Sequence, residues 1–253
     1  MRTSETDHFG RAAGTRWDEL LLTLRSVFDI ACAAATTGAS NPNDPTAAGE
    51  AGGAAIDVYL LNGHADGRKQ FPGIRSYGEL ENHLRGLPVR GRTPTLECMQ
   101  DLFHYERMQA IGELPVLTVL FTDGQPDSGI PAFSQFLSHV QHQFGNSFIT
   151  IALCTGDDAV VSMYNALDSG IPRTDVMDDY RSERAEVVGI QGRKFPFSKS
   201  DYLVKMLLGS RVTLWDSLDE RKLSKPQRKM FEDYSAAAFG VSSKNSKGDC
   251  VIS

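Results

Sequence analysis

The first regular pattern along the chain is a stripe of apolar residues at helical spacing. From Trp17 onward, apolar side chains fall at i+3, i+4, i+7, i+10 and i+11, which places them on one face of a helix. Thr15 and Asp18 stand at the start of this stripe at the spacing of a capping box. The pattern predicts a helix that buries one side. Residues 37–54, which follow it, are mostly small, so we expect a flexible surface loop there.

Short apolar runs then alternate with amphipathic stretches. Strand-like runs occupy residues 56–62, 116–124 and 147–154, and the last two are apolar at almost every position. A strand that is apolar on both faces is typical of a parallel sheet with helices on both sides. Helices are predicted between and after these runs, at 77–86, through Met99 and Phe103, at 131–143, at 158–168 and at about 200–208, where Gly209 ends the last one.

This alternation between residue 17 and about residue 209 predicts the fold class. It indicates an α/β domain with a doubly wound, mostly parallel sheet and helices on both faces. Ligands of such sheets bind beyond the carboxyl ends of the strands. We therefore expect a domain over residues 1–210, a C-terminal extension over residues 211–253, and functional residues in the loops that follow strands.

Composition and net charge limit the class of protein and the kinds of molecule that it could bind. Of the 253 residues, 41% are hydrophobic, which is enough for a substantial core. No apolar stretch approaches the ~18 residues of a membrane span and the N-terminus is polar, so we expect a cytoplasmic protein without a signal peptide. Basic minus acidic residues give 26 − 32 = −6, which argues against nucleic acid as a partner. Residues 221–253, however, carry seven basic and three acidic residues. The four cysteines are far apart and form no metal-binding pair.

Two predicted loops at the carboxyl edge of the sheet contain hard oxygen ligands. Thr93 lies in the loop 91–95, and Asp123 follows the most apolar strand. A hydroxyl and a carboxylate on separate loops suit Mg²⁺ or another divalent cation, which prefers oxygen ligands and keeps several waters. An Asp-Gly pair is also ordinary turn chemistry at the end of a strand. The residues alone leave both interpretations open.

The order of these motifs resembles the von Willebrand factor type A domain, over roughly residues 1–210. The matching motifs are the helix from Arg16, the strand 56–62, the loop with Thr93, the strand ending in Thr122-Asp123-Gly124, the strand 147–154 and the segment 174–180. That family carries a metal-ion-dependent adhesion site, built from an Asp-x-Ser-x-Ser loop, a Thr and an Asp. The resemblance implies that Thr93 and Asp123 are metal ligands, and that the domain is a protein-binding module and not an enzyme.

The sequence departs from the family at its beginning. No Asp-x-Ser-x-Ser precedes the Trp17 helix, so two of the family's five ligand side chains are present. A site with only two protein ligands should bind Mg²⁺ weakly. In many relatives the missing loop ends in a Met ahead of an Arg-Trp helix, and Met1 stands at the matching place. One hypothesis is that Met1 is an internal methionine and that the first strand lies upstream. The other is a domain that has lost its metal.

The last four residues, Cys250-Val251-Ile252-Ser253, match a prenylation box, and a terminal Ser favours a farnesyl group. One prenyl chain anchors a protein only reversibly. The basic run 221–229 could add attraction to acidic lipid. With lipidation at Cys250, we expect peripheral attachment to the cytoplasmic face of a membrane. Each feature also has an alternative explanation. The last four residues could match a prenylation box by chance, and the basic run could be the solvated face of an ordinary helix.

These features favour a protein–protein interaction module that uses, or descends from, a divalent-cation adhesion site. An acidic residue of the partner would complete the metal's shell. A rival is an enzyme that uses Asp123 for metal-dependent phosphoryl transfer or hydrolysis, but the chain has no phosphate-binding loop or nucleophile elbow. A third candidate is a metal-free scaffold. His139 and His142 share a helix face without the further ligands of a zinc site. The clustered Asp175, Asp178 and Asp179 are expected to cap helices rather than to act in catalysis.

Replacing Cys250 tests the tail. The Cys250→Ser protein should move from membranes to the soluble fraction, because the Cys250 thiolate is the group of the box that a prenyl chain joins. A buried farnesyl chain contributes several kcal/mol at about 0.8 kcal/mol per CH₂, far more than two exposed lysines. Fractionation of cells and mass spectrometry of the C-terminal peptide measure both effects. An unmodified peptide ending in Val-Ile-Ser, from cells with active prenyltransferase, would make the match a coincidence.

Overall fold

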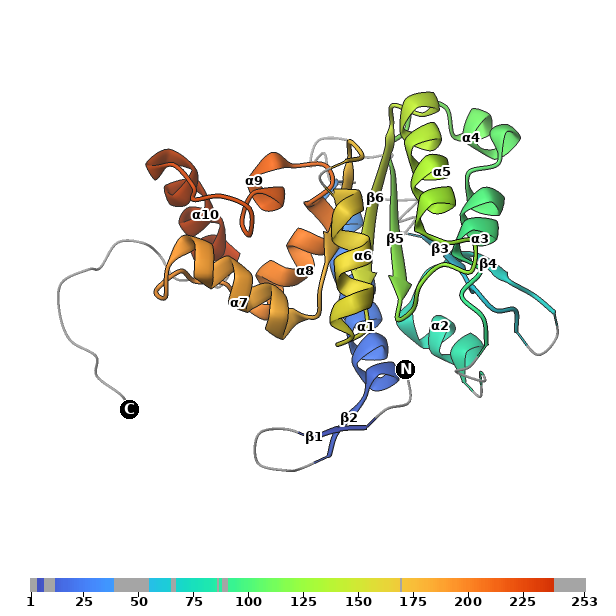
Figure 1. Ribbon diagram of the computed structural model, residues 1–253, viewed down its shortest axis with the longest axis horizontal. Coiled ribbons are helices and arrows are strands. Elements are labelled where there is room, and N and C mark those ends of the chain that lie inside the picture. Colours follow the sequence, from blue (N-terminus) through green and yellow to red (C-terminus); the bar gives the residue numbers. More distant parts are fainter. Residues whose placement is uncertain are drawn as a thin grey trace, which may run out of the picture.

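The computed structural model describes residues 4–6, 12–38, 55–64, 67–85, 87, 91–168 and 170–238. Within them helices alternate with strands, which confirms the α/β class (Figure 1). A parallel sheet has the strand order β5–β6–β7, formed by β5 (Val116–Thr122), β6 (Ser147–Leu153) and β7 (Thr174–Met177). Two antiparallel pairs are separate from it: β3 (Ile56–Tyr59) with β4 (Gln70–Ile74), and β1 (Ser4–Thr6) with β2 (Ala12–Thr15).

Helices cover both faces of the parallel sheet. On one face, Leu120 and Ile151 belong to a core with residues of α3 (Thr95–Leu102), α4 (Tyr105–Ile111), α5 (Ile130–Gln143) and α6 (Asp158–Asp168). On the other face, Phe121 and Met177 belong to a core with residues of α1 (Arg16–Gly38), α7 (Tyr180–Gln191) and α8 (Lys199–Leu208). As its sequence predicts, β6 is buried on both faces.

Helix α1 begins where the capping box predicts. The Thr15 N–H donates to Asp18 Oδ2 at 2.7 Å, and the Asp18 N–H donates to Thr15 Oγ1 at 3.2 Å. The apolar stripe of α1 packs on two cores. Its first turns, from Trp17 to Leu24, pack with the β3–β4 hairpin and α2 (Tyr77–Leu84). Val27 and Ile30 pack with the core of the parallel sheet. One helix therefore joins the hairpin to the sheet.

Most elements predicted from the sequence are present with shifted ends. The predicted loop 37–54 lies outside the described residues from residue 39 onward, and residues 37 and 38 end α1. Elements that the apolar pattern did not predict are β1, β2, β4, β7, α4, α7, α9 (Thr213–Asp216) and, except for its basic start, α10 (Lys225–Ala238). Among the described residues, none of the helices is both long and apolar enough to span a bilayer.

Helix α8 ends at Gly209, as predicted, but for a different reason. A glycine that ends a helix usually adopts a left-handed conformation. Gly209 instead has φ −52° and ψ −57°, which any residue can adopt. A Cβ at this position would collide with Asp175 Oδ2 of β7. The glycine therefore leaves room for the Asp175 carboxylate against the end of α8, which a helical pattern does not reveal.

The described part of the C-terminal extension packs onto the domain. Phe231 of α10 is fully buried, and its ring lies 4.7 Å from that of Phe195 and 5.2 Å from that of Trp215. Arg228 donates to the Gln191 carbonyl at 3.2 Å. These contacts attach α10 to the end of α7, and through Phe231 the helix contributes to the core on one face of the parallel sheet.

Truncation of Phe231 tests this attachment. The Phe231→Ala protein should lose about 3–5 kcal/mol of unfolding free energy, because a buried ring is replaced by a cavity. Tyr234 lies on the same helix and is 57% exposed, so Tyr234→Ala is the matched control and should change little. Urea unfolding followed by circular dichroism measures both. Equal unfolding midpoints for wild type and Phe231→Ala would mean that α10 adds nothing to the core.

Candidate functional site

The loop with Thr93 and the loop after β5 meet at the carboxyl end of the parallel sheet. The Asp127 carboxylate accepts a hydrogen bond from the Thr93 N–H at 3.2 Å, and the Asp127 N–H donates to the Thr93 carbonyl at 3.0 Å. Arg92 Nε lies 3.0 Å from the same carboxylate. Asn62, which follows β3, donates to the Arg92 carbonyl at 2.7 Å. Asp127 therefore holds the two loops together, and the end of β3 is tied to them.

Thr93 and Asp123, the two predicted metal ligands, belong to adjoining parts of this cluster. Thr93 Oγ1 lies 3.0 Å from the point that a Cβ on Gly124 would occupy, so the Thr93 side chain lies against the residue after Asp123. Both Thr93 and Asp123 are half-buried. The Tyr164 hydroxyl of α6 donates to the Gly124 carbonyl at 3.1 Å, which holds the turn in place. The fold thus brings together the two loops that contain the predicted ligands.

The oxygen atoms of this cluster suit a hard divalent cation, but they are few. A hydroxyl and a carboxylate are ligands that Mg²⁺ accepts. Two further hydroxyls of these loops, Thr95 Oγ1 and Ser128 Oγ, are buried and have no hydrogen-bond partner in the described part of the chain. The residues present fit the chemistry of such a cation. Water or a partner's oxygen atoms would have to complete its shell.

A second group of charged side chains is buried between β7, α7 and α8. The ammonium of Lys205, which is fully buried, lies 3.0 Å from Glu183 Oε1, 3.3 Å from Asp219 Oδ1 and 3.6 Å from Asp175 Oδ1. The carboxylates come from β7, from α7 and from the segment after α9. One ammonium therefore faces three carboxylates, of which those of Asp175 and Glu183 are also buried. We call these four residues the Lys205 cluster.

Burial shifts the pKa values of the Lys205 cluster. It raises the pKa of Glu183 to about 8; Lys205 opposes this shift, and Asp219 and Asp175 add to it. Burial alone would lower the pKa of Lys205, but the three carboxylates outweigh it and the pKa lies well above its usual value. Burial thus favours the protonated form of Glu183, and the carboxylates favour the charged form of Lys205.

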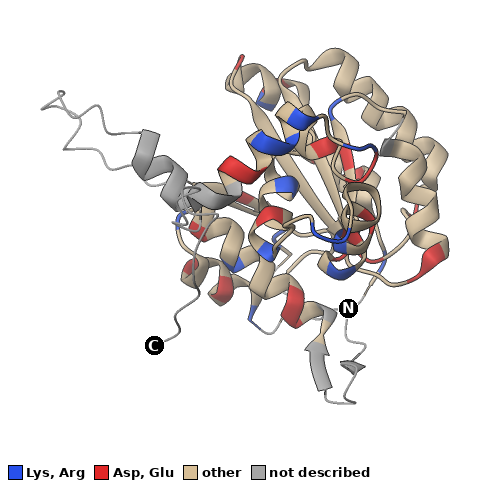
Figure 2. Ribbon diagram, turned by 90° about the vertical axis from the view of Figure 1, so that its left-hand side faces the viewer, with Lys and Arg blue, Asp and Glu red and all other residues tan. Residues whose placement is uncertain are grey.

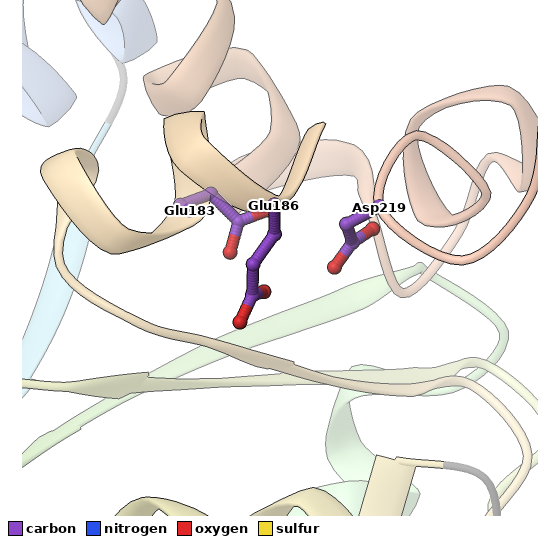
Figure 3. Close-up of side chains that lie close together, drawn as sticks. All are labelled: Glu183, Glu186 and Asp219. Carbon is purple, nitrogen blue, oxygen red and sulfur yellow. The ribbon is translucent and has the colours of Figure 1, made fainter. Parts of the chain in front are cut away.

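Part of this region could hold a metal ion. Glu183 and Glu186 of α7 and Asp219 each offer a carboxylate oxygen, and these atoms lie within 4.8 Å of one another (Figure 3). Lys205 already supplies a positive charge to two of the three carboxylates. A metal ion here would have to share the site with that ammonium, which like-charge repulsion opposes. We interpret the group as part of a structural charge cluster.

Sequence reasoning missed the Lys205 cluster. Its members are far apart along the chain, and no spacing connects them. The one local signal is that Lys205 interrupts the apolar stretch 203–208 of α8. A lysine inside such a stretch is a candidate for burial against a carboxylate. Asp175 was recognised, but as a helix cap, whereas it is a partner of Lys205.

The remaining candidates have ordinary roles or lie outside the described residues. His139 and His142 are exposed on α5. Asp179 caps α7 by accepting hydrogen bonds from two backbone N–H groups, which confirms its predicted structural role. On the face shown in Figure 2, basic and acidic residues are interspersed along the helices. Within the basic run, Arg228 packs over the Phe195 ring at 5.3 Å, so this residue is part of the fold. Cys250 lies outside the described residues.

Comparison with models of known families, with curated proteins and with solved structures found no match to this chain.

The protonation of Glu183 gives a pH-dependent prediction. A carboxyl whose pKa rises on folding stabilises the protein at low pH, and this contribution is lost as the pH rises through the folded-state pKa. The unfolding free energy of wild type, relative to Glu183→Gln, should fall by about 2 kcal/mol or more between pH 5 and pH 8. Denaturant unfolding at several pH values measures it. The matched control, Glu97→Gln at an exposed position of α3, should show no such slope. A flat difference for Glu183→Gln would mean that Glu183 is already ionised at pH 5.

Proposed function

We propose that this protein is a protein–protein interaction domain of the von Willebrand type A class, with a divalent-cation site formed by Thr93 and Asp123. The observation that carries the proposal is the position of the Thr93 side chain against Gly124, the residue after Asp123. The family takes its Thr and Asp ligands from two such loops. A parallel sheet with helices on both faces supports the finer assignment to a doubly wound fold.

In this proposal the cation is a bridge between the domain and its partner. Thr93 would contribute its hydroxyl and Asp123 its carboxylate, and the bound cation would supply positive charge for a carboxylate of the partner. Two ligand side chains alone should bind Mg²⁺ with low affinity. A partner that adds a charged ligand would therefore strengthen binding of the cation, and the cation would strengthen binding of the partner to the same extent.

A metal-free scaffold is the second candidate, and one observation favours it. The two loops are held together by protein groups alone, since Asp127 accepts a hydrogen bond from the Thr93 N–H and pairs with Arg92. Arg92 is 79% exposed at the same edge, so its guanidinium could receive a partner's carboxylate directly. The two candidates differ in one property, which is whether a chelator abolishes binding.

The proposal includes a membrane tether. A farnesyl group on Cys250 would place the domain on the cytoplasmic face of a membrane. This part is supported by the prenylation box at the end of the chain. Among the described residues α10, which ends at Ala238, is the last element, so the eleven residues from 239 to 249 would lie between it and a lipid on Cys250.

Substitution of the two ligands tests the cation site. Calorimetric titration of the wild-type protein with Mg²⁺ should give saturable binding, and both Asp123→Ala and Thr93→Ala should weaken it by roughly tenfold or more. The loss should be larger for Asp123→Ala because it removes a charge. Glu113→Gln is the matched control, since Glu113 is an exposed carboxylate ahead of β5, at the opposite end of that strand from Asp123.

Two results would contradict the cation site. Equal affinities of wild type and Asp123→Ala would place the cation elsewhere. An absence of Mg²⁺ binding by the wild-type protein, together with chelator-resistant binding to a partner, would favour the metal-free scaffold. Far-UV circular dichroism of each variant checks that the fold is retained.

A further inference from the structure

Three segments that are far apart along the chain meet at the end of α7. Gln191, the last residue of this helix, donates through its side-chain amide to the Arg221 carbonyl at 2.7 Å. Its side-chain oxygen accepts a hydrogen bond from the Leu223 N–H at 3.0 Å, and its backbone carbonyl accepts one from Arg228 at 3.2 Å. The turn 192–194, the segment that precedes α10 and the start of α10 are therefore neighbours.

This convergence assembles a basic surface on an otherwise acidic protein. The stretches 192–194 and 220–234 carry seven basic and three acidic residues, whereas the rest of the chain carries 26 − 7 = 19 basic and 32 − 3 = 29 acidic ones. Five of the seven basic residues are exposed and take part in no ion pair within the described part of the chain: Arg193, Lys194, Lys222, Lys225 and Lys229. Two of these five come from the turn after α7, so the surface is larger than the basic run of the sequence.

Exposed apolar side chains lie beside the basic ones on α10. Met230 is 44% exposed and Tyr234 is 57% exposed. Together with Pro226, Lys229 and Asp233 they line one open hollow of the surface. Basic side chains next to an aromatic and an aliphatic one suit the boundary between water and a bilayer, where Tyr is enriched at the level of the headgroups.

The parts of the chain outside the described residues supply little negative charge to cover this surface. Segment 239–253, which follows α10 directly, contains Lys244, Lys247 and one acidic residue, so it adds positive charge. Segment 39–54 contains two acidic residues, against five exposed basic ones. Two carboxylates would leave most of the basic surface without compensation. An anionic partner outside the chain fits the surface better.

The position of α10 favours a membrane over an acidic protein as that partner. The helix ends at Ala238, and eleven residues separate it from Cys250 of the prenylation box. Such a segment spans at most about 40 Å when fully extended. A lipid on Cys250 would therefore keep α10 close to the bilayer. One prenyl chain anchors only reversibly, and stable attachment needs a second signal such as a basic surface.

We propose that the turn 192–194, the segment 220–223 and α10 form a docking surface for the anionic headgroups of the cytoplasmic leaflet, such as phosphatidylserine. The five exposed basic residues bind the phosphates and carboxylates, while Met230 and Tyr234 enter the headgroup layer. This inference rests on the membrane tether of the proposed function, and it adds which side of the domain meets the bilayer. The β3–β4 hairpin lies on the other side of the parallel sheet (Figure 1), so it faces away from the membrane.

Vesicle binding by the full-length protein without a prenyl group tests the surface separately from the tether. The probe is vesicles of phosphatidylcholine with about 30% phosphatidylserine. Cosedimentation should show saturable binding to these vesicles and none to pure phosphatidylcholine. The affinity should fall by at least about tenfold between 0.1 M and 1 M NaCl, because the Debye length shortens from about 10 Å to about 3 Å. An absence of prenylation at Cys250 in cells would leave this result unchanged, so the two proposals fail separately.

An Arg-Lys pair occurs both on the surface and far from it, which provides matched variants. Each basic residue near an anionic membrane strengthens binding by about fivefold, so Arg193→Gln/Lys194→Gln should weaken vesicle binding by at least about tenfold. Arg68→Gln/Lys69→Gln removes the same charge from the loop between β3 and β4, on the other side of the sheet. This control should change the affinity by less than about twofold, because its distance exceeds the Debye length. Circular dichroism verifies that both variants fold.

A second pair tests the apolar contact. Tyr234→Ala should weaken vesicle binding by about threefold or more, because the ring no longer enters the headgroup layer. Tyr105 is 58% exposed on α4, so Tyr105→Ala is the matched control and should bind as wild type does. Cosedimentation at fixed salt measures both.

Three outcomes would overturn the proposal. Equal affinities of wild type and Arg193→Gln/Lys194→Gln would place the lipid contact elsewhere. Equal binding to vesicles with and without phosphatidylserine would mean that the basic residues have no role. Binding to soluble polyglutamate without binding to vesicles would make an acidic protein segment the partner.

Discussion

The buried ammonium of Lys205 is the interaction on which the C-terminal half of the structure depends. It joins β7, α7, α8 and the segment after α9 through Asp175, Glu183 and Asp219. Removing one partner of a buried ion pair typically costs about 3–5 kcal/mol, because the remaining charges lose their compensation. Without the ammonium, the three carboxylates would repel one another in a largely buried site. The same arrangement explains Gly209, since a side chain there would collide with Asp175.

The sequence predicted the fold well where burial follows a simple period. The helix from Arg16, the strands β5 and β6 and the helices α5, α6 and α8 were all indicated by apolar spacing, because each packs an apolar stripe or an apolar run on one core. α7 was missed because it is rich in charged residues, and one of these, Glu183, is buried and paired with Lys205. β4 was missed because Pro72 and Gly73 interrupt its short apolar run.

The candidate site could be predicted only in part. Asp123 was selected as a candidate because a parallel sheet places functional residues in the loops after its strands, and Thr93 was selected because its loop resembles the family's second ligand loop. The proximity of their loops depends on Asp127, whose role the sequence conceals, because an Asp in a Gly- and Pro-containing turn has an ordinary explanation. The Lys205 cluster is assembled from residues that no local pattern relates. Tertiary contacts alone bring these charges together.

Helix α1 packs at once on the hairpin and on the parallel sheet, and this sharing has a thermodynamic consequence. A segment that belongs to two cores cannot leave one of them without exposing apolar surface in the other. The hairpin and the sheet should therefore unfold in a single cooperative transition rather than one after the other. Any ligand that binds the folded form at either part raises the melting temperature of both. Thermal stabilisation can thus reveal a ligand of this protein without indicating where it binds.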